Sequence, residues 1–451
     1  MLPETASSIG DRPAARTAYR GTGEETSVLH DQIRQQVMRV FMIEREQFTF
    51  DEQAYARIMR HNLLVDPTSR LTAMFEGRLV IDSETAYEQL DQAFTEMNQV
   101  PLFREDEGKH IIYVVAGRVK PRPRPYGLNI ILFVLTILSV MWLGAEIAIS
   151  QIADTDPALG RQLTENFTQN PLSELLRGWP YAVCIILILG AHELGHYFAA
   201  RRHKLAVTLP YFIPMPPFLL PTPFGTFGAF IQLREPMRNR KVLLDVGAAG
   251  PYMGLVFAIP ILFIGLATSP IKDLLPGMVY SMEGNSLLYA LAKTIIFGHF
   301  LPNGVQDVFL NQVAWAGWTG LLITALNLIP IGQLDGGHML YSLIGRRART
   351  LYYPLMGLAL LLVFTSETWI FWFILLLLFG RMYAVPLDDI TPLDNRRKFL
   401  SVLGLIVFVV TFIPVPFAQV TVPNLGSRDS VMMLPAVVTM LTLWTSRHLR
   451  R

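Results

Sequence analysis

Apolar runs close to 20 residues long recur from Gly127 to the end of the chain. As a helix, a run of this length crosses a hydrocarbon core about 30 Å thick. The composition agrees, because 51% of the 451 residues are hydrophobic and 16% are charged, whereas a soluble domain has about 25% charged residues. The sequence therefore predicts a polytopic α-helical membrane protein.

Clusters of basic residues between the apolar runs predict how the chain crosses the membrane. Under the positive-inside rule, short segments rich in Lys and Arg stay on the cytoplasmic side. Every such cluster lies on that side if the chain makes about eight spans, with both termini cytoplasmic and residues 352–380 folded as a hairpin. The expected spans are residues 127–149, 179–200, 243–267, 313–328, two within 352–380, 399–417 and 430–444.

Two segments between these spans differ from the rest. The acidic stretch that contains Asp154, Asp156 and Glu165 is expected to be an outward-facing loop. Residues 287–300 are apolar in part, but they contain Lys293 and are too short for a clean span. We expect this segment to be interfacial or re-entrant.

The residues before the first span predict a separate soluble part. Residues 1–27 are polar and lack the apolar core of a signal peptide, which indicates a disordered tail. Residues 28–118 contain two strand-like runs, 78–81 and 111–115, with a helical pattern that starts near Asp82 between them. A small soluble α+β domain with a regulatory or docking role is therefore expected. A basic, proline-rich linker (119–126) and a transmembrane domain (127–451) follow.

The remaining composition narrows the class of partners. A formal net charge of +2 gives no argument for nucleic-acid binding. The single cysteine, Cys184, excludes an intrachain disulfide. The lipid bilayer is the partner that the composition predicts directly.

One expected span contains the pattern HExxH, formed by His192, Glu193 and His196. A spacing of four residues places both imidazoles on one face of a helix, where they can share a metal ion. The intervening glutamate can then accept a proton from a water that zinc has acidified. Two His and one Glu inside a span are costly unless they face a cavity or a ligand. We therefore expect a Zn²⁺ site about 7 Å below the cytoplasmic end of this span.

A catalytic zinc site needs a third protein ligand, and three side chains are candidates. Glu235 precedes Pro236 in a basic loop, where an ordinary ion pair is expected instead. Asp335 follows a stretch broken by proline and glycine, and broken backbone at membrane depth persists only where it is buried or lines a polar cavity. We favour Asp335. His338, just after the break, competes as a ligand or supports the site from behind.

Two motifs on separate spans resemble those of the site-2 protease family of intramembrane metalloproteases. Residues 192–200 (HELGHYFAA) match its first motif, and Asn327, Pro330, Asp335 and Gly336 match its NxxPxxxxDG pattern. The resemblance covers residues 171–345 well. The chain lacks the inserted PDZ-like domain and the following CBS pair of some members. Its soluble part comes first, as in plastid and cyanobacterial members, which implies a bacterial plasma membrane or its plastid equivalent.

The resemblance also implies roles for single residues. His192, His196 and Asp335 would bind zinc, Glu193 would act as general acid and base, and Asn327 would help to hold the substrate. Residues 225–230 are similar to a membrane-dipping β-type loop of the family, and residues 247–251 to the small-residue start of its next core helix. The implied activity is hydrolysis of peptide bonds in transmembrane protein substrates.

Two other functions remain open at this point. A metal transporter also carries His and Asp in its spans, but transporters commonly repeat such elements in both halves, and no second HExxH-like element occurs here. A pseudoprotease that only binds membrane partners would not need the base Glu193. The remaining intramembrane carboxyl, Glu146, lies near the outer end of its span and is expected to be interfacial.

Overall fold

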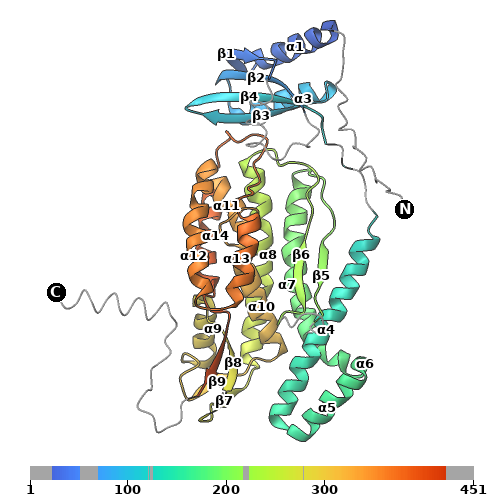
Figure 1. Cartoon of the computed structure of the whole chain (residues 1–451), viewed down its shortest axis with the longest axis vertical. Helices are drawn as coiled ribbons and strands as arrows, with labels where there is room; N and C mark the ends of the chain where they lie inside the picture. The colour runs from blue at the N-terminus through green and yellow to red at the C-terminus, as the bar shows by residue number, and fades with distance from the viewer. Residues whose placement is uncertain are drawn as a thin grey trace, which may run out of the picture. The chain divides into compact units, whose positions relative to one another are not determined.

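The computed structural model describes residues 23–50, 70–119, 121, 125–216, 223–277 and 279–422. Contacts group these residues into two units, one that ends at Arg118 and one that begins at Val119. The helices and strands of each unit are shown in Figure 1.

Among the described residues, the first unit is a four-stranded antiparallel sheet with two helices. Its strand order is β1-β2-β4-β3, and α3 begins after Asp82, whose side chain accepts a hydrogen bond from the Thr85 amide at 2.9 Å. The apolar face of α3 is buried, which confirms the predicted α+β region. The elements are α1 Gly23–Met38, β1 Phe41–Gln47, β2 Arg70–Leu79, α3 Ser83–Glu96, β3 Gln99–Asp106 and β4 Lys109–Ala116.

Two details of this unit differ from the expectations. Helix α1 begins at Gly23, so the predicted disordered tail is wrong from that residue on, because a helix had been missed in a stretch with little apolar periodicity. The expected strand at residues 78–81 is the end of the longer β2, which stops at Leu79. The rest of the predicted tail lies outside the described residues.

In the described part of the second unit, three helical segments are long and apolar enough to cross a membrane. They are α4 Gly127–Thr155, the segment Pro171–Arg202, and α8 Arg240–Ala267. The second consists of α6 Pro171–Glu174, the 3₁₀ turn Leu175–Gly178 and α7 Trp179–Arg202. The first, second and third expected spans therefore correspond to long apolar helices.

The other expected spans correspond to shorter helices. A helix of 12 residues is about 18 Å long, which is less than the hydrocarbon thickness. The expected hairpin is present as α12 and α13, which are 12 residues each. The last expected span, 430–444, lies outside the described residues. These helices are α10 Gln312–Asn327, α11 Asp335–Ile344, α12 Tyr352–Val363, α13 Thr368–Phe379 and α14 Asn395–Thr411, with a 3₁₀ turn Gly345–Leu351 between α11 and α12.

The expectation of a loop between the first two spans is wrong, because that stretch is largely helical, while its outward orientation stays a prediction. Helix α5, Pro157–Gln169, begins after Asp156, whose carboxylate accepts hydrogen bonds from the amides of Ala158 and Leu159. Leu163 and Phe167 are buried, and the Phe167 ring lies 4.9 Å from that of Trp142 on α4. Aspartate at the N-cap followed by proline favours the start of a helix, and the prediction of a loop did not take this signal into account.

The described residues of the second unit also form short strands and one further helix. The strands pair as β5 Tyr211–Pro214 with β6 Thr226–Phe230, β7 Ile271–Asp273 with β9 Gln306–Val308, and β8 Val279–Glu283 with β10 Phe417–Thr421. Helix α9, Leu287–Phe297, occupies the segment that was expected to be interfacial or re-entrant.

Helix α8 is the centre of the second unit. It packs against α7, α10 and α11, so the helices that carry both sequence motifs share one neighbour. Figure 1 shows α8 among these helices. The hydrophobic core runs along this contact and includes Leu255, Leu262, Trp318 and Leu326.

Residues 381–394, here called the strap, join α13 to α14 by an extended path. The strap forms backbone hydrogen bonds with the segment before α8. The amides of Leu387 and Asp388 donate to the carbonyls of Met237 and Arg238 at 2.9 and 2.7 Å. Asp389 is 4% exposed and accepts from the Arg240 guanidinium at 2.8 Å and the Tyr341 hydroxyl at 3.0 Å. The strap therefore ties α8 to α11.

Candidate metal centre

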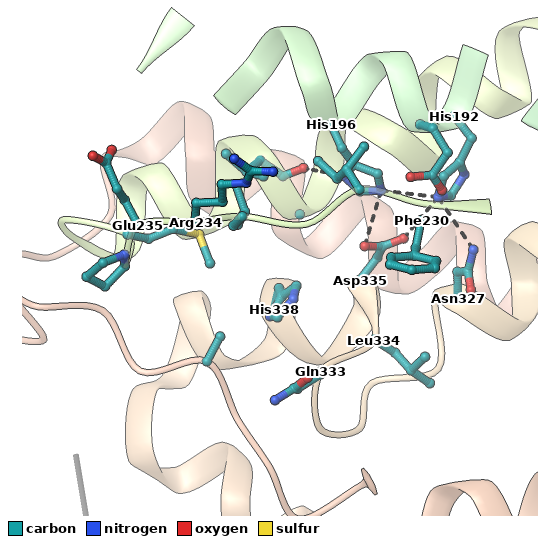
Figure 2. Close-up of a pocket in the computed structure, with 18 of the residues that line it drawn as sticks. His192, His196, Phe230, Arg234, Glu235, Asn327, Gln333, Leu334, Asp335 and His338 are labelled. Atoms are coloured by element: carbon teal, nitrogen blue, oxygen red, sulfur yellow. Dashed lines mark hydrogen bonds and ion pairs between the residues drawn. The ribbon is translucent and has the colours of Figure 1, made fainter. Parts of the chain in front are cut away.

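Helix α7 presents two histidines toward a common point. His192 and His196 lie one turn apart, and both are buried, at 4% and 7% exposed. Their Nε2 atoms are 3.2 Å apart, as Figure 2 shows. The i, i+4 spacing of the HExxH pattern has placed both rings on one face of the helix, as predicted.

Asp335 reaches the same point from a different element. It is the first residue of α11, and the seven residues before it, 328–334, break the chain away from α10. Gly332 adopts φ +60°, which a residue with a side chain rarely does, and so permits the turn. The Asp335 carboxylate oxygens lie 3.2 Å from His192 Nε2 and 3.4 Å from His196 Nε2.

The three side chains fit a zinc ion. Ligand atoms about 2.0–2.2 Å from a tetrahedral zinc are about 3.3–3.6 Å from one another. The observed separations are 3.2, 3.2 and 3.4 Å, and a carboxylate with two imidazoles is a donor set of catalytic zinc sites. Among the described residues, these three form the one cluster of His, Cys, Asp or Glu that could hold a metal ion.

The backbone of α8 fixes the orientation of His196. The Nδ1 atom of His196 lies 2.7 Å from the carbonyl oxygen of Val246. A carbonyl can only accept, so Nδ1 carries the proton and donates it there, which leaves the lone pair of Nε2 for a metal. Helix α8 thus supports the site without supplying a ligand.

Glu193 lies in the same cavity as the three metal-binding candidates. The cavity has a volume of about 560 Å³, and His192, Glu193, His196, Asn327 and Asp335 all line it. Glu193 is 5% exposed, and Asn327 places its Nδ2 atom 3.4 Å from His192 Nε2. The structure therefore brings together all five residues that the sequence had singled out.

The competing candidates lie apart from the metal cluster. Glu235 lines the cavity, but its Oε2 atom accepts a hydrogen bond from the Ala206 amide at 3.1 Å, and it is not in the cluster. His338 also lines the cavity without joining the cluster. Glu146, on α4, accepts from the Trp142 indole at 2.8 Å and is not among the residues that line the cavity.

Two parts of the cavity wall come from segments with weaker sequence signals. Ala229 and Phe230 of β6 line it, and β6 pairs in antiparallel fashion with β5, as the predicted β-type loop implied. Ala384 of the strap lines it as well. No motif in the sequence pointed to the strap, because its place depends on one ion pair and two backbone hydrogen bonds with residues about 150 positions earlier.

Small residues within α8 leave space for the histidines. A Cβ atom on Gly250 would lie 2.0 Å from His196 Nε2, well inside contact distance. The sequence had suggested close packing at residues 247–251, and the structure shows that the neighbour is the metal site itself.

Replacing Gly250 with alanine should therefore displace the His196 ring and weaken metal binding at least 10-fold. Gly190→Ala is the matched control, because a Cβ atom at Gly190, on α7, would meet no neighbouring atom within 4 Å. Zinc stoichiometry and affinity of both purified variants measure the effect. Equal zinc affinity in the two variants would contradict the assignment of His196 Nε2 as a metal-binding atom.

Comparison with known proteins agrees with the geometry. Residues 180–364 match peptidase family M50. An Arabidopsis thaliana protein named probable zinc metalloprotease EGY1, chloroplastic, is 31% identical over 307 residues, which cover 64% of this chain and 53% of the relative. Probable zinc metalloprotease EGY2, chloroplastic, of the same plant is 32% identical over 267 residues, covering 58% of this chain and 46% of the relative.

A rice relative extends the match. The EGY1 protein of Oryza sativa subsp. japonica, also named a probable zinc metalloprotease, is 27% identical over 378 residues, covering 76% of this chain and 62% of the relative. The chain thus spans about half the length of the curated relatives it matches first. No solved structure matches the chain.

Proposed function

We propose that this chain is an intramembrane zinc metalloendopeptidase of the site-2 protease type, because residues 180–364 match peptidase family M50. Its substrates are membrane-spanning proteins whose peptide bonds it hydrolyses with a metal-activated water. One observation carries the proposal. Glu193 lies beside His192, His196 and Asp335 in one cavity, where the three ligand atoms have the separations of a tetrahedral zinc site.

Zinc is the metal that the donor set and the relatives both favour. The three relatives described above are named zinc metalloproteases. When bound, zinc supplies Lewis-acid polarisation of a carbonyl and lowers the pKa of water to about 7. A non-proteolytic metal transporter is less well supported, since a transport path needs further polar sites and the described residues contain one metal cluster.

Glu193 is the residue that moves protons in the proposed reaction. As a carboxylate, it accepts the proton of the attacking water, and as a carboxylic acid it returns that proton to the leaving amine. Its burial keeps bulk water from competing for the proton and strengthens its interaction with the reacting groups. Asn327, next to His192, offers an amide that can hold the substrate main chain.

Metal analysis and a cleavage assay on the full-length chain in detergent test this function. About one zinc per chain and cleavage of a single-span protein, lost on chelation and restored by zinc, are the expected results. Cleavage that continues at the same rate after zinc removal would contradict the metalloprotease mechanism.

The proposed topology places the active site near the cytoplasmic side. Asp245 of α8 binds His203, just after α7, at 2.9 Å and Arg397 of α14 at 2.6 Å. The basic clusters at these helix ends therefore gather at one end of the unit, as a positive-inside arrangement with about eight spans requires. The membrane is a bacterial plasma membrane or its plastid equivalent. A cysteine introduced at Arg347 should react with an impermeant thiol reagent from the cytoplasmic side; labelling from the opposite side alone would contradict this topology.

The N-terminal unit is proposed to be a regulatory or docking domain, covering residues 28–118 ahead of the linker 119–126. All three metal-binding candidates lie beyond it in the chain, within the proposed catalytic core 171–345. A chain that lacks residues 1–118 should still bind zinc but cleave a different set of substrates. Unchanged substrate choice in the shortened chain would contradict the regulatory role.

A further inference from the structure

His338 lines the cavity but does not belong to the cluster of metal-binding candidates. It lies three residues after Asp335, one turn along α11, and its side chain lines the cavity that also contains Glu193. Figure 2 shows His338 next to Asp335 on the same helix. Its Nδ1 atom is buried and has no hydrogen-bond partner among the described residues.

Helix α8 defines the direction of the His338 ring. A Cβ atom on Gly247 would lie 2.7 Å from His338 Cβ and 3.5 Å from its Cδ2 atom. The Cδ2 edge of the ring therefore faces α8. Because Nδ1 is on the opposite edge, it is directed away from α8, and α8 supplies it with no partner.

A buried nitrogen without a partner is costly. It forfeits its hydrogen bonds to water, at about 1–3 kcal/mol, and native proteins keep few such groups. A leucine would fill a similar volume without that cost. Since His338 lines the catalytic cavity, a partner for its unpaired Nδ1 atom can arrive when the substrate enters.

A peptide that is cut inside a membrane needs donors of this kind. Hydrolysis requires the substrate helix to unwind locally, and unwinding frees carbonyl oxygens from their intrahelical hydrogen bonds. The surrounding hydrocarbon offers them no hydrogen bonds, so groups that line the cavity have to take that role. Asn327 is one such donor, on the side of His192.

We propose that His338 is a substrate-binding residue, whose Nδ1–H donates a hydrogen bond to a main-chain carbonyl oxygen of the unwound substrate segment. The inference rests on the proposed protease function and extends it to one further residue. It gives the catalytic cavity two main-chain donors, Asn327 from the end of α10 and His338 from α11, on either side of Asp335.

Two substitutions separate this role from a structural one. His338→Leu keeps the bulk and removes the donor. His338→Asn restores a donor close to the original position, because the Asn amide nitrogen is bonded to Cγ just as Nδ1 is. Both are made in the full-length chain that also carries Glu193→Gln, so that a bound substrate is not cut. The probe is a fluorescein-labelled peptide with one Ala/Leu span of about 20 residues, interrupted by Asn-Gly.

The expected results concern binding, zinc content and stability. His338→Leu should weaken binding of the peptide about 10-fold, a typical loss for one hydrogen bond, and His338→Asn should recover most of it. All variants should keep the same zinc content. The melting temperature of His338→Leu should not fall, because the substitution removes an unpaired buried nitrogen.

Two outcomes overturn the proposal. A lower zinc content in His338→Leu would make the residue part of the metal site. A lower melting temperature with unchanged peptide binding would make it structural. Because the readouts are binding, zinc and stability, they are independent of hydrolysis: absence of cleavage by the unmodified chain would contradict the proposed protease function without deciding the role of His338.

Discussion

Replacing Glu193 with glutamine should leave zinc in place and abolish peptide hydrolysis. The three ligand atoms belong to other side chains, so the metal cluster is intact in this variant. Glutamine has nearly the same shape but cannot accept the proton of the attacking water. Loss of a general base typically lowers the rate about 100- to 10,000-fold. Zinc stoichiometry and cleavage of a single-span substrate, measured on the same preparation, provide the check.

Glu146→Gln is the matched control for that experiment. Glu146 is also a carboxyl residue within a candidate span. It accepts a hydrogen bond from the Trp142 indole and is not among the residues that line the cavity. The control should cleave at close to the normal rate. Near-normal cleavage by Glu193→Gln would rule out Glu193 as the base.

Removal of the third ligand should have an even broader effect, since it affects both metal and activity. Asp335→Ala deletes the carboxylate that faces both imidazoles at 3.2 and 3.4 Å and leaves two neutral ligands on α7. Zinc affinity should fall by more than the factor of about 10–100 seen when a residue that merely supports a ligand is lost. Hydrolysis should be undetectable at every zinc concentration that is low enough to avoid unspecific binding of zinc elsewhere on the protein.

Glu235→Ala gives the comparison that makes the result specific. Glu235 lines the same cavity, but its carboxylate accepts a hydrogen bond from the Ala206 amide and does not belong to the metal cluster. This variant should retain most of its zinc and activity in the same detergent. If Glu235→Ala lost zinc and Asp335→Ala kept it, the assignment of the third ligand would be wrong.

The pairing of the two histidines in the candidate metal cluster could be predicted from the sequence because local rules decide their arrangement. The turn of a helix aligns His192 with His196, and no other part of the chain is needed for that. Asp335 required a further argument, since nothing local links it to α7. Pro330 and Gly332 before it, with Gly336 and Gly337 after it, marked a break in the helix, and a break at membrane depth indicated a cavity.

Other features of the site depend on contacts that leave no pattern in the sequence. The carbonyl of Val246 that orients His196 belongs to a regular helix, and any residue type could provide it. Gly250 is one of several glycines in α8, and its closeness to His196 appears only when α7 and α8 are packed together. Leu387 and Asp388 pair with residues about 150 positions earlier through backbone atoms, which carry no side-chain signature.

The strap has a consequence for the shortest piece of this chain that could function alone. The match to the peptidase family ends at residue 364, and all three ligands precede that point. Yet Gly332, in the turn that delivers Asp335, packs against Gly380, and Asp389 holds the start of α8 to α11. A fragment that ends at residue 364 would keep Glu193 and the three metal-binding candidates. It would lose the contacts of Gly380 and Asp389 that hold the turn before Asp335 and the start of α8 in place. The family match therefore ends inside the set of contacts that position the candidate active site.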